Sequence, residues 1–562
     1  MKKVIALCLV AVLLLGGCAK VDFAGYFDQL SYFFGDTGGA GGESGGKSKG
    51  GSEVYTDPTT DYKDIRFEDI TYYRPDMDEL PGILEESCAI AESSEDISEV
   101  EDAILEYYWI YDEFYTSYFL ANIYYCLDMT DTYWQEEYSF CEENSTAADA
   151  GLEELYYALA KSPIRDELEG ERYFGEGFFD YYEGESIWDD TFVGMMEQES
   201  ELINEYYAIL SEATDVEYYS EEFFSTYGDR LGQLLVELIA LRQNMAAYVG
   251  YDSYPQFAYD FYYYRDYTPE EALALAEDIR RELAPLYGSV NSSSYWGEGY
   301  LYCSEYDNYA YVRSCAEAMG GDVADAFQAM DEGGFFDITY SEKKSTGSFT
   351  VYLNSYYMPY VFVGAAEINY DKLSFAHEFG HFVNDYCCYG SYSGIDVAEV
   401  FSQGMEYLSL CYAEDEAALE RFKLVDGLAA FVEQSAYATF EQKMYDLKGD
   451  DLTVENLAAL YEDICTSYQL DRYNWDSRDF VTIEHFYTNP MYVISYVVSN
   501  DVAFQLYQLE KEDPGAGLDV YLDNIDSEES YIVYFAEGIG LESPFAQGRA
   551  ADIRQSLEEM LQ

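Results

Sequence analysis

Five long segments of the chain repeat apolar and aromatic residues at intervals of three and four positions. This spacing places those side chains on one face of an α-helix, because a helix turns once every 3.6 residues. Such faces must be buried against other elements, so a mainly α-helical protein is predicted. The segments are residues 97–127, 149–161, 196–212, 221–249 and 269–287. The last one begins with Pro269 directly after Thr268, a pair typical of a helix N-terminus.

One stretch departs from the helical pattern. Residues 347–364 contain two runs rich in β-branched and aromatic residues, separated by Asn354-Ser355. These runs predict a small pair of β-strands. Because proline cannot donate a ladder hydrogen bond, Pro359 places its run at a sheet edge or at a strand start.

Directly after this strand pair the chain contains His377-Glu378-Phe379-Gly380-His381. Two histidines four residues apart lie on one face of a helix and can bind one zinc ion. The glutamate between them can take a proton from a metal-activated water molecule. Two of the three histidines in the chain are in this motif, so chance accounts poorly for it. We predict His377 and His381 as zinc ligands and Glu378 as the general base.

A catalytic zinc ion needs a third protein ligand. No further histidine lies nearby, so a carboxylate from the helical segment 398–406 is expected. From the residues alone Glu399 is favoured, and Glu406 is the alternative. Glu399 also stands three residues after Asp396, so it could instead be the third residue of a helix capping box.

The motif HEFGH followed by AEVFSQGMEY resembles the thimet oligopeptidase and oligoendopeptidase F family of zinc peptidases. The resemblance implies that Glu399 is the third ligand, with Glu406 as the following carboxylate of the helix. The loop from His381 to Glu399 is shorter than in familiar members, which keeps Glu406 open as the alternative. The resemblance further implies one zinc ion per chain and two helical lobes around a deep substrate channel, with the small sheet beside the motif's helix.

The third histidine begins the segment HFYTNPMYVISY, residues 485–496, which is similar to a family segment that faces the zinc. The resemblance implies that His485, Tyr492 and Tyr496 stabilise the oxyanion formed during hydrolysis, and that Tyr487 contacts the substrate. The alternative is that these four side chains are ordinary core residues.

Two further matches precede the motif. Residues 344–349 and 359–361 are similar to paired family strands, the second of which binds the substrate backbone. The resemblance therefore implies that Tyr360 and Val361 line the substrate groove. It covers roughly residues 65–560 and is weak from 80 to 240. We expect an N-terminal helical lobe at 61–240 and a catalytic lobe at 241–562.

The N-terminus indicates export and lipid anchoring. Two lysines and an apolar run lead to Leu15-Gly16-Gly17-Cys18, which resembles a bacterial lipobox. Residues 1–17 are therefore predicted to be a lipoprotein signal peptide, and Cys18 the lipidated residue of an extracytoplasmic protein on the bacterial cell membrane. An ordinary signal peptide with an incidental cysteine is the alternative. Residues 18–60, rich in glycine and serine, are expected to be a tether.

The chain is strongly acidic, with 110 Asp and Glu against 29 Lys and Arg and a net charge of −81. Such a surface repels phosphate backbones, so nucleic acid is excluded as a partner. The acidity either keeps the surface solvated or favours cationic substrates. Nine cysteines follow Cys18, an odd number for which buried thiols are expected.

These observations predict a monomeric zinc-dependent metalloendopeptidase that hydrolyses oligopeptides. A dipeptidyl carboxypeptidase of the angiotensin-converting type is a second candidate, although the segment that begins at His485 argues against it. A lipid-anchored peptide-binding protein without catalysis is a third, although such a protein would need no general base at Glu378.

Overall fold

The computed structural model describes residues 65–561 apart from short gaps. The gaps are residues 171–173, 176, 181, 185–186, 188, 214–215, 217–219, 291–296, 391–393, 415, 471–475 and 528. The predicted signal peptide, Cys18 and the tether lie outside the described residues. Within the described part of the chain, no helix is long and apolar enough to cross a membrane.

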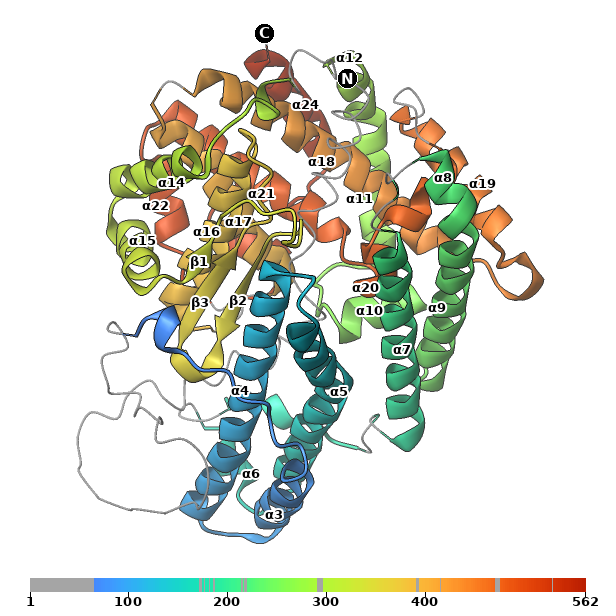
Figure 1. Ribbon diagram of the computed structural model, residues 1–562, viewed down its shortest axis with the longest axis vertical. Helices are drawn as coiled ribbons and strands as arrows, with labels where there is room; N and C mark the ends of the chain where they lie inside the picture. Colours follow the sequence, from blue (N-terminus) through green and yellow to red (C-terminus); the bar gives the residue numbers. More distant parts are fainter. Residues whose placement is uncertain are drawn as a thin grey trace.

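The described chain is mainly helical with one small sheet, which confirms the predicted fold class (Figure 1). The N-terminal helices are α3 (Leu80–Ser93), α4 (Ile97–Leu127), α5 (Thr132–Ala160) and α6 (Arg165–Leu168). They are followed by α7 (Asp190–Glu212), α8 (Glu221–Phe223), α9 (Asp229–Tyr248), α10 (Tyr254–Phe261), α11 (Pro269–Glu282), α12 (Ala284–Val290), α14 (Glu305–Met319) and α15 (Gly321–Gly333). After the sheet come α16 (Asp371–Cys388), α17 (Ile395–Tyr412), α18 (Ala417–Met444), α19 (Val454–Ser467), α20 (His485–Thr488), α21 (Ile494–Glu512), α22 (Ala516–Leu522), α23 (Ile532–Gly538) and α24 (Arg549–Met560).

The helix boundaries follow from local sequence signals. The segment predicted at 97–127 is α4, and Asp96 caps it by accepting a hydrogen bond from the Ser98 amide. Thr268 forms a complete capping box with Glu271 at the start of α11, where Pro269 occupies the first turn. The segment predicted at 221–249 is interrupted by a π-helix at Phe224–Gly228, between α8 and α9.

The sheet contains three strands, β1 (Phe336–Asp337), β2 (Phe349–Leu353) and β3 (Met358–Phe362). Their spatial order is β1-β3-β2, with β2 antiparallel and β1 parallel to β3. The predicted pair is thus confirmed as β2 and β3, and β1 is an addition. Pro359 stands at the start of its strand, as one of the two predicted placements requires. The sheet lies between α4 and α16 (Figure 1).

Close packing of α16 against α17, and of α17 against α21, forms the centre of the C-terminal part. Gly380 makes the first of these contacts possible. A Cβ atom at Gly380 would lie 2.6 Å from the Phe401 carbonyl oxygen and 2.7 Å from the Ser402 Cα. The backbones of α16 and α17 can therefore approach this closely only because residue 380 has no side chain.

Buried apolar side chains form two clusters, in agreement with a two-lobed arrangement. One cluster is built from residues between Leu80 and Tyr182, largely from α3, α4 and α5. The other is built mainly from residues after Phe192 of α7 and includes side chains of the sheet, α16, α17 and α21. The exact lobe boundary near residue 240 stays a prediction. The nine described cysteines form no disulfide bond among themselves.

Candidate active site

The helix α16 carries the histidine motif in the interior of the protein. The rings of His377 and His381 lie on the same face, with centroids 5.1 Å apart. Glu378, which follows His377 in the sequence, is fully buried. The motif thus has the helical geometry predicted from its spacing.

Glu399 of α17 completes a cluster with these histidines. Its Oε2 atom lies 3.5 Å from His377 Nε2 and 3.9 Å from His381 Nε2. One ligand atom from each residue lies within 4.8 Å of the other two. Both Nε2 atoms are buried and have no hydrogen-bond partner among the described residues. Two orphaned imidazole nitrogens facing one carboxylate oxygen suit a divalent cation, and this donor set suits zinc.

The remaining contacts of Glu399 turn its Oε2 atom toward the histidines. Tyr492 donates a hydrogen bond to Oε1 at 2.7 Å, and Ser402 donates to Oε2 at 2.9 Å. The alternative capping role is not observed, because the N-cap of α17 is Gly394 and no side chain of the described residues caps the helix. Asp396 instead accepts a hydrogen bond from Tyr267 at 2.8 Å.

Glu406 lies on the opposite side of His377. Its Oε1 atom is 2.8 Å from His377 Nδ1, and its Oε2 atom is 2.6 Å from the Lys423 ammonium. Lys423 also binds Asp426, at 3.3 Å. Glu406 therefore keeps a proton on Nδ1, and loss of the other ring proton to a bound cation would leave the Nε2 lone pair directed toward Glu399. Lys423 and Asp426 are absent from the sequence-based site, since nothing in the motif spacing indicates α18.

Thr350 of β2 joins the sheet to the motif. Its hydroxyl lies 2.9 Å from both the Glu378 carbonyl oxygen and Glu378 Oε2. A hydrogen bond to Oε2 restrains the rotation of the carboxylate. The expected closeness of sheet and motif is the only sequence signal that could have pointed to this threonine.

His485 is buried beside two of the predicted tyrosines. Its ring centroid lies 5.4 Å from that of Tyr492 and 5.9 Å from that of Tyr496. Its Nε2 atom is buried and has no hydrogen-bond partner in the described part of the chain. The structure thus brings these three rings together, and Tyr492 links them to Glu399.

Tyr487 lies apart from these three rings, and its contact with substrate stays a prediction. Its ring stacks on Tyr206 with centroids 4.2 Å apart, and its hydroxyl donates to the Leu231 carbonyl at 3.2 Å. The side chain is completely buried in the core between α7 and α9. The short helix α20 points His485 and Tyr487 toward different neighbours.

The substrate-binding role of Tyr360 and Val361 stays a prediction. Both belong to β3, the central strand, which has a partner on each side. The Val361 amide donates to the Phe335 carbonyl at 3.0 Å. By the alternation of an antiparallel ladder, the backbone groups of its partner Thr350 point to the other edge of β2.

Burial and charge set the protonation of the three histidines. Although burial opposes protonation, Glu406 and Glu399 raise the pKa of His377 to about 9. Burial, and then repulsion from His377, lower the pKa of His381 well below its usual value. Burial lowers the pKa of His485 to about 4, so it is neutral near pH 7.

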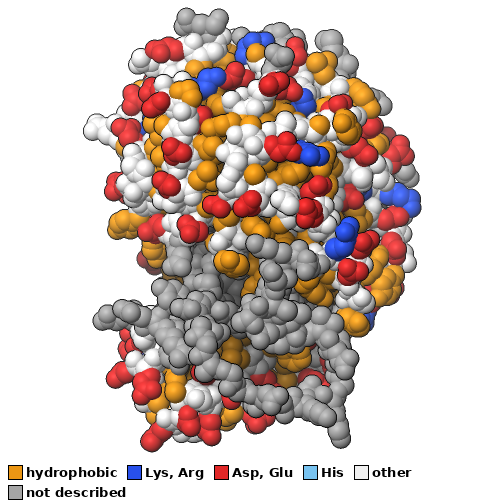
Figure 2. Space-filling model, turned by 90° about the vertical axis from the view of Figure 1, so that its left-hand side faces the viewer, with side chains coloured by type: hydrophobic (Ala, Val, Ile, Leu, Met, Phe, Trp, Pro, Cys, Tyr) orange, Lys and Arg blue, Asp and Glu red, His pale blue; other side chains and the backbone are white. Residues whose placement is uncertain are grey.

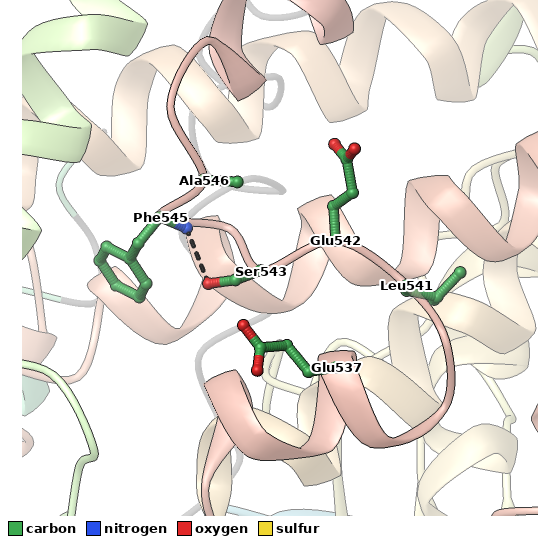
Figure 3. Close-up of a pocket in the computed structure, with 6 residues that line it drawn as sticks. All are labelled: Glu537, Leu541, Glu542, Ser543, Phe545 and Ala546. Carbon is green, nitrogen blue, oxygen red and sulfur yellow. Dashed lines mark hydrogen bonds between the residues drawn. The ribbon is translucent and has the colours of Figure 1, made fainter.

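A hollow of about 450 Å³ lies apart from this cluster, at the end of α23 and the loop from α23 to α24 (Figure 3). It is lined by Glu537, Leu541, Glu542, Ser543, Phe545 and Ala546. None of these side chains is a histidine or a cysteine, and the hollow shares no residue with the cluster on α16 and α17.

Comparisons with known proteins agree with this architecture. Residues 67–186 match the family model described as the peptidase M3 N-terminal domain. This match covers the part of the chain in which the sequence resemblance is weak. Among curated proteins, none gives a significant sequence match.

Solved structures match over nearly their whole length. An oligoendopeptidase F structure at 3.1 Å is 20% identical with a TM-score of 0.77, covering 88% of this chain and 98% of that chain. PZ peptidase A, solved with an inhibitor, is 18% identical with a TM-score of 0.77 and coverages of 88% and 99%. An oligoendopeptidase F of Bacillus anthracis strain Ames is 19% identical with a TM-score of 0.75 and coverages of 88% and 98%. The resemblance is confirmed by the family model in the N-terminal part and by the fold across the chain.

Proposed function

We propose that this chain, which has the fold of the oligoendopeptidase F structures, is a zinc-dependent metalloendopeptidase acting on oligopeptides. The observation that carries the proposal is the convergence of two orphaned imidazole nitrogens and Glu399 Oε2 within 4.8 Å. Glu378, on the same helix, supplies a general base. The oligopeptidases among the similar structures support a peptide substrate.

In this proposal His377, His381 and Glu399 would hold one zinc ion, which when bound would supply a Lewis acid for the scissile carbonyl and for a water molecule. Glu378 takes a proton from the attacking water and delivers it to the leaving amine. Thr350, 2.9 Å from Glu378 Oε2, keeps the carboxylate turned toward the reacting atoms.

Negative charge develops on the carbonyl oxygen as water attacks, and it needs preorganised donors. His485 and Tyr496 are proposed to supply them, since their rings lie 5.9 Å apart. Tyr492 has a different part, because its hydroxyl already donates to Glu399 at 2.7 Å. Tyr492 is therefore proposed to orient the third ligand.

The test is a comparison of wild type with Glu378→Gln. We expect peptide cleavage to fall by about a hundredfold to ten-thousandfold, with one zinc ion per chain retained. Glu455→Gln, an exposed substitution on α19, is the control and should keep full activity. Zinc binding without any wild-type cleavage would favour the peptide-binding alternative.

A blocked peptide separates endopeptidase from carboxypeptidase action. We expect cleavage at internal bonds of peptides whose C-terminus is amidated. Release of dipeptides from free C-termini alone would favour the angiotensin-converting type.

We further propose that the protein is extracytoplasmic and anchored to the cell membrane through Cys18. The support is the lipobox-like sequence before Cys18 and the glycine-rich stretch after it. A Cys18→Ser variant should move from the membrane fraction to the soluble fraction. An unchanged distribution would remove the lipidation proposal and leave the peptidase proposal untouched.

A further inference from the structure

The turn that leads into Tyr492 contains a strained residue. Met491 has a φ of 72°, in the left-handed region that residues other than glycine rarely adopt. Its amide donates to Glu441 Oε1 at 2.6 Å, and its carbonyl accepts from Arg265 Nη1 at 2.8 Å. The Tyr263 hydroxyl donates to the preceding carbonyl of Pro490 at 2.9 Å. Such a conformation persists only where its surroundings enforce it.

Of the residues that contact this turn, Arg265 also contacts side chains outside it. Its guanidinium lies 4.4 Å and 4.3 Å from the ring centroids of Tyr259 and Tyr263, and the side chain is 1% exposed. Its Nη2 donates to the Ser495 hydroxyl at 2.8 Å, four residues after Met491 and in the first turn of α21.

The same guanidinium also contacts the helix that carries Glu399. Arg265 Nε lies 3.4 Å from Asp396 Oδ2, in the first turn of α17. Asp396 and Glu399 are three residues apart and share a face of α17. One planar group therefore joins the turn before Tyr492 to the helix of the proposed third ligand.

We infer that Arg265 is a positioning residue, which holds the Tyr492 hydroxyl against Glu399 through the Met491 carbonyl and the Ser495 hydroxyl. This inference rests on the proposed function. A lysine at position 265 keeps the charge, but its single ammonium lacks the rigid fork needed to reach both acceptors and Asp396 together. Arg265→Lys should therefore let the turn relax while a buried positive charge remains.

A double-mutant cycle with Tyr492→Phe tests the inference. Arg265→Lys and Tyr492→Phe should each lower kcat about tenfold to a hundredfold with little change in KM. The double variant should be no slower than Tyr492→Phe alone, because Arg265 acts through the lost hydroxyl. Multiplying effects, or an unchanged kcat in Arg265→Lys, would overturn the inference.

Arg549→Lys is the matched control for loss of a buried arginine. Its guanidinium lies 2.6 Å from Asp501 on α21 and touches neither the turn nor Glu399. We expect a lower Tm for this variant and an unchanged kcat.

Ser495→Ala removes a single contact of Arg265 and should still fold if Arg265→Lys does not. Ser495→Ala should then lower kcat less than is expected for Arg265→Lys, and this fall should disappear in the Tyr492→Phe background. A fall in kcat of the same size with and without the Tyr492 hydroxyl would contradict the inference.

The cycle is repeated with Tm as the readout, which needs no catalytic activity. The loss of Tm in the double variant should be smaller than the sum of the two single losses. An absence of zinc-dependent cleavage in wild type would end the proposed function, whereas this coupling of Tm values would still be measurable. Additive losses would overturn the positioning of Tyr492 by Arg265.

Discussion

Glu399 and Glu406 lie two turns apart on α17 and reach opposite nitrogens of His377. Glu399 Oε2 lies 3.5 Å from Nε2, whereas Glu406 Oε1 lies 2.8 Å from Nδ1. A metal ligand and the carboxylate that orients a ligand differ in what their removal costs. Loss of an orienting partner typically lowers metal affinity about tenfold to a hundredfold, while loss of a ligand removes a coordination bond.

We therefore predict that Glu406→Gln weakens zinc binding by about tenfold to a hundredfold and that Glu399→Ala weakens it far more. Competition with a chelator of known affinity measures both dissociation constants. Ser409→Ala, a buried change on the same helix, is the control and should bind zinc normally. Zinc retained in Glu399→Ala and lost in Glu406→Gln would transfer the ligand role to Glu406.

Glu433 of α18 should make the stability of the protein depend on pH. Burial raises its pKa from 4.5 to about 7, although the Tyr287 hydroxyl donates to it at 2.6 Å. Between about pH 4.5 and pH 7, the folded state thus holds a proton that the unfolded state has already released. The unfolding free energy must fall across that window as the pH rises, by up to about 3 kcal/mol from this group.

Glu433→Gln should remove that part of the pH dependence. We expect the variant to gain up to about 3 kcal/mol relative to wild type between pH 4.5 and pH 8, as measured by denaturant unfolding. The exposed substitution Glu455→Gln should show no such gain. A difference between Glu433→Gln and wild type that stays constant with pH would show that Glu433 ionises normally in the folded protein.

At the scale of elements, the approach of α17 to α16 decides whether Glu399 reaches the histidines. We predict that Gly380→Ala separates the two helices, because its Cβ would lie 2.6 Å from the Phe401 carbonyl. Overpacking of this kind costs about 1–3 kcal/mol, and zinc affinity should fall with it. Thermal unfolding and zinc titration measure the two effects.

Gly194→Ala is the matched control for Gly380→Ala. Gly194 also lies within a helix, α7, but a Cβ there would meet nothing within 4 Å. Alanine is the better helix former by about 1 kcal/mol, so this variant should be as stable as wild type or more so. If Gly380→Ala behaves like Gly194→Ala, the close approach is not what sets the site.

Elements with strong local signals could be predicted from the sequence. The helix α4 follows its apolar spacing from Ile97 to Leu127, and the capping box at Thr268 is formed. By contrast, β1 has only two residues, and its partner Val361 lies far along the chain. So short a strand leaves no periodic pattern, and its existence depends on tertiary pairing alone.

The same distinction applies to the candidate site. His377, Glu378 and His381 are neighbours in sequence, and one helix fixes their relative positions. Lys423 comes from α18, and only the packing of three helices brings it to Glu406. The direction of Tyr487 depends on its contact with Tyr206, which no local pattern contains.

At the scale of the whole molecule, the net charge of −81 acts on any charged ligand. On the face shown in Figure 2, Asp and Glu side chains are spread over the described surface, with few Lys and Arg among them. This distribution suits a solvated surface. It also gives this face a negative field, which attracts cations at long range.

We predict that Lys- and Arg-containing peptides are cleaved with a higher kcat/KM than acidic peptides of equal length. Electrostatic attraction raises the association rate by about ten to a thousandfold at low ionic strength. Salt should reduce the advantage, since the screening length is only about 8 Å at 0.15 M. Matched cationic and anionic peptides, assayed at low and high salt, measure it. Because attraction acts before chemistry, kcat should be similar for both peptides. Equal kcat/KM at low salt would leave solvation as the sole physical role of the acidic surface.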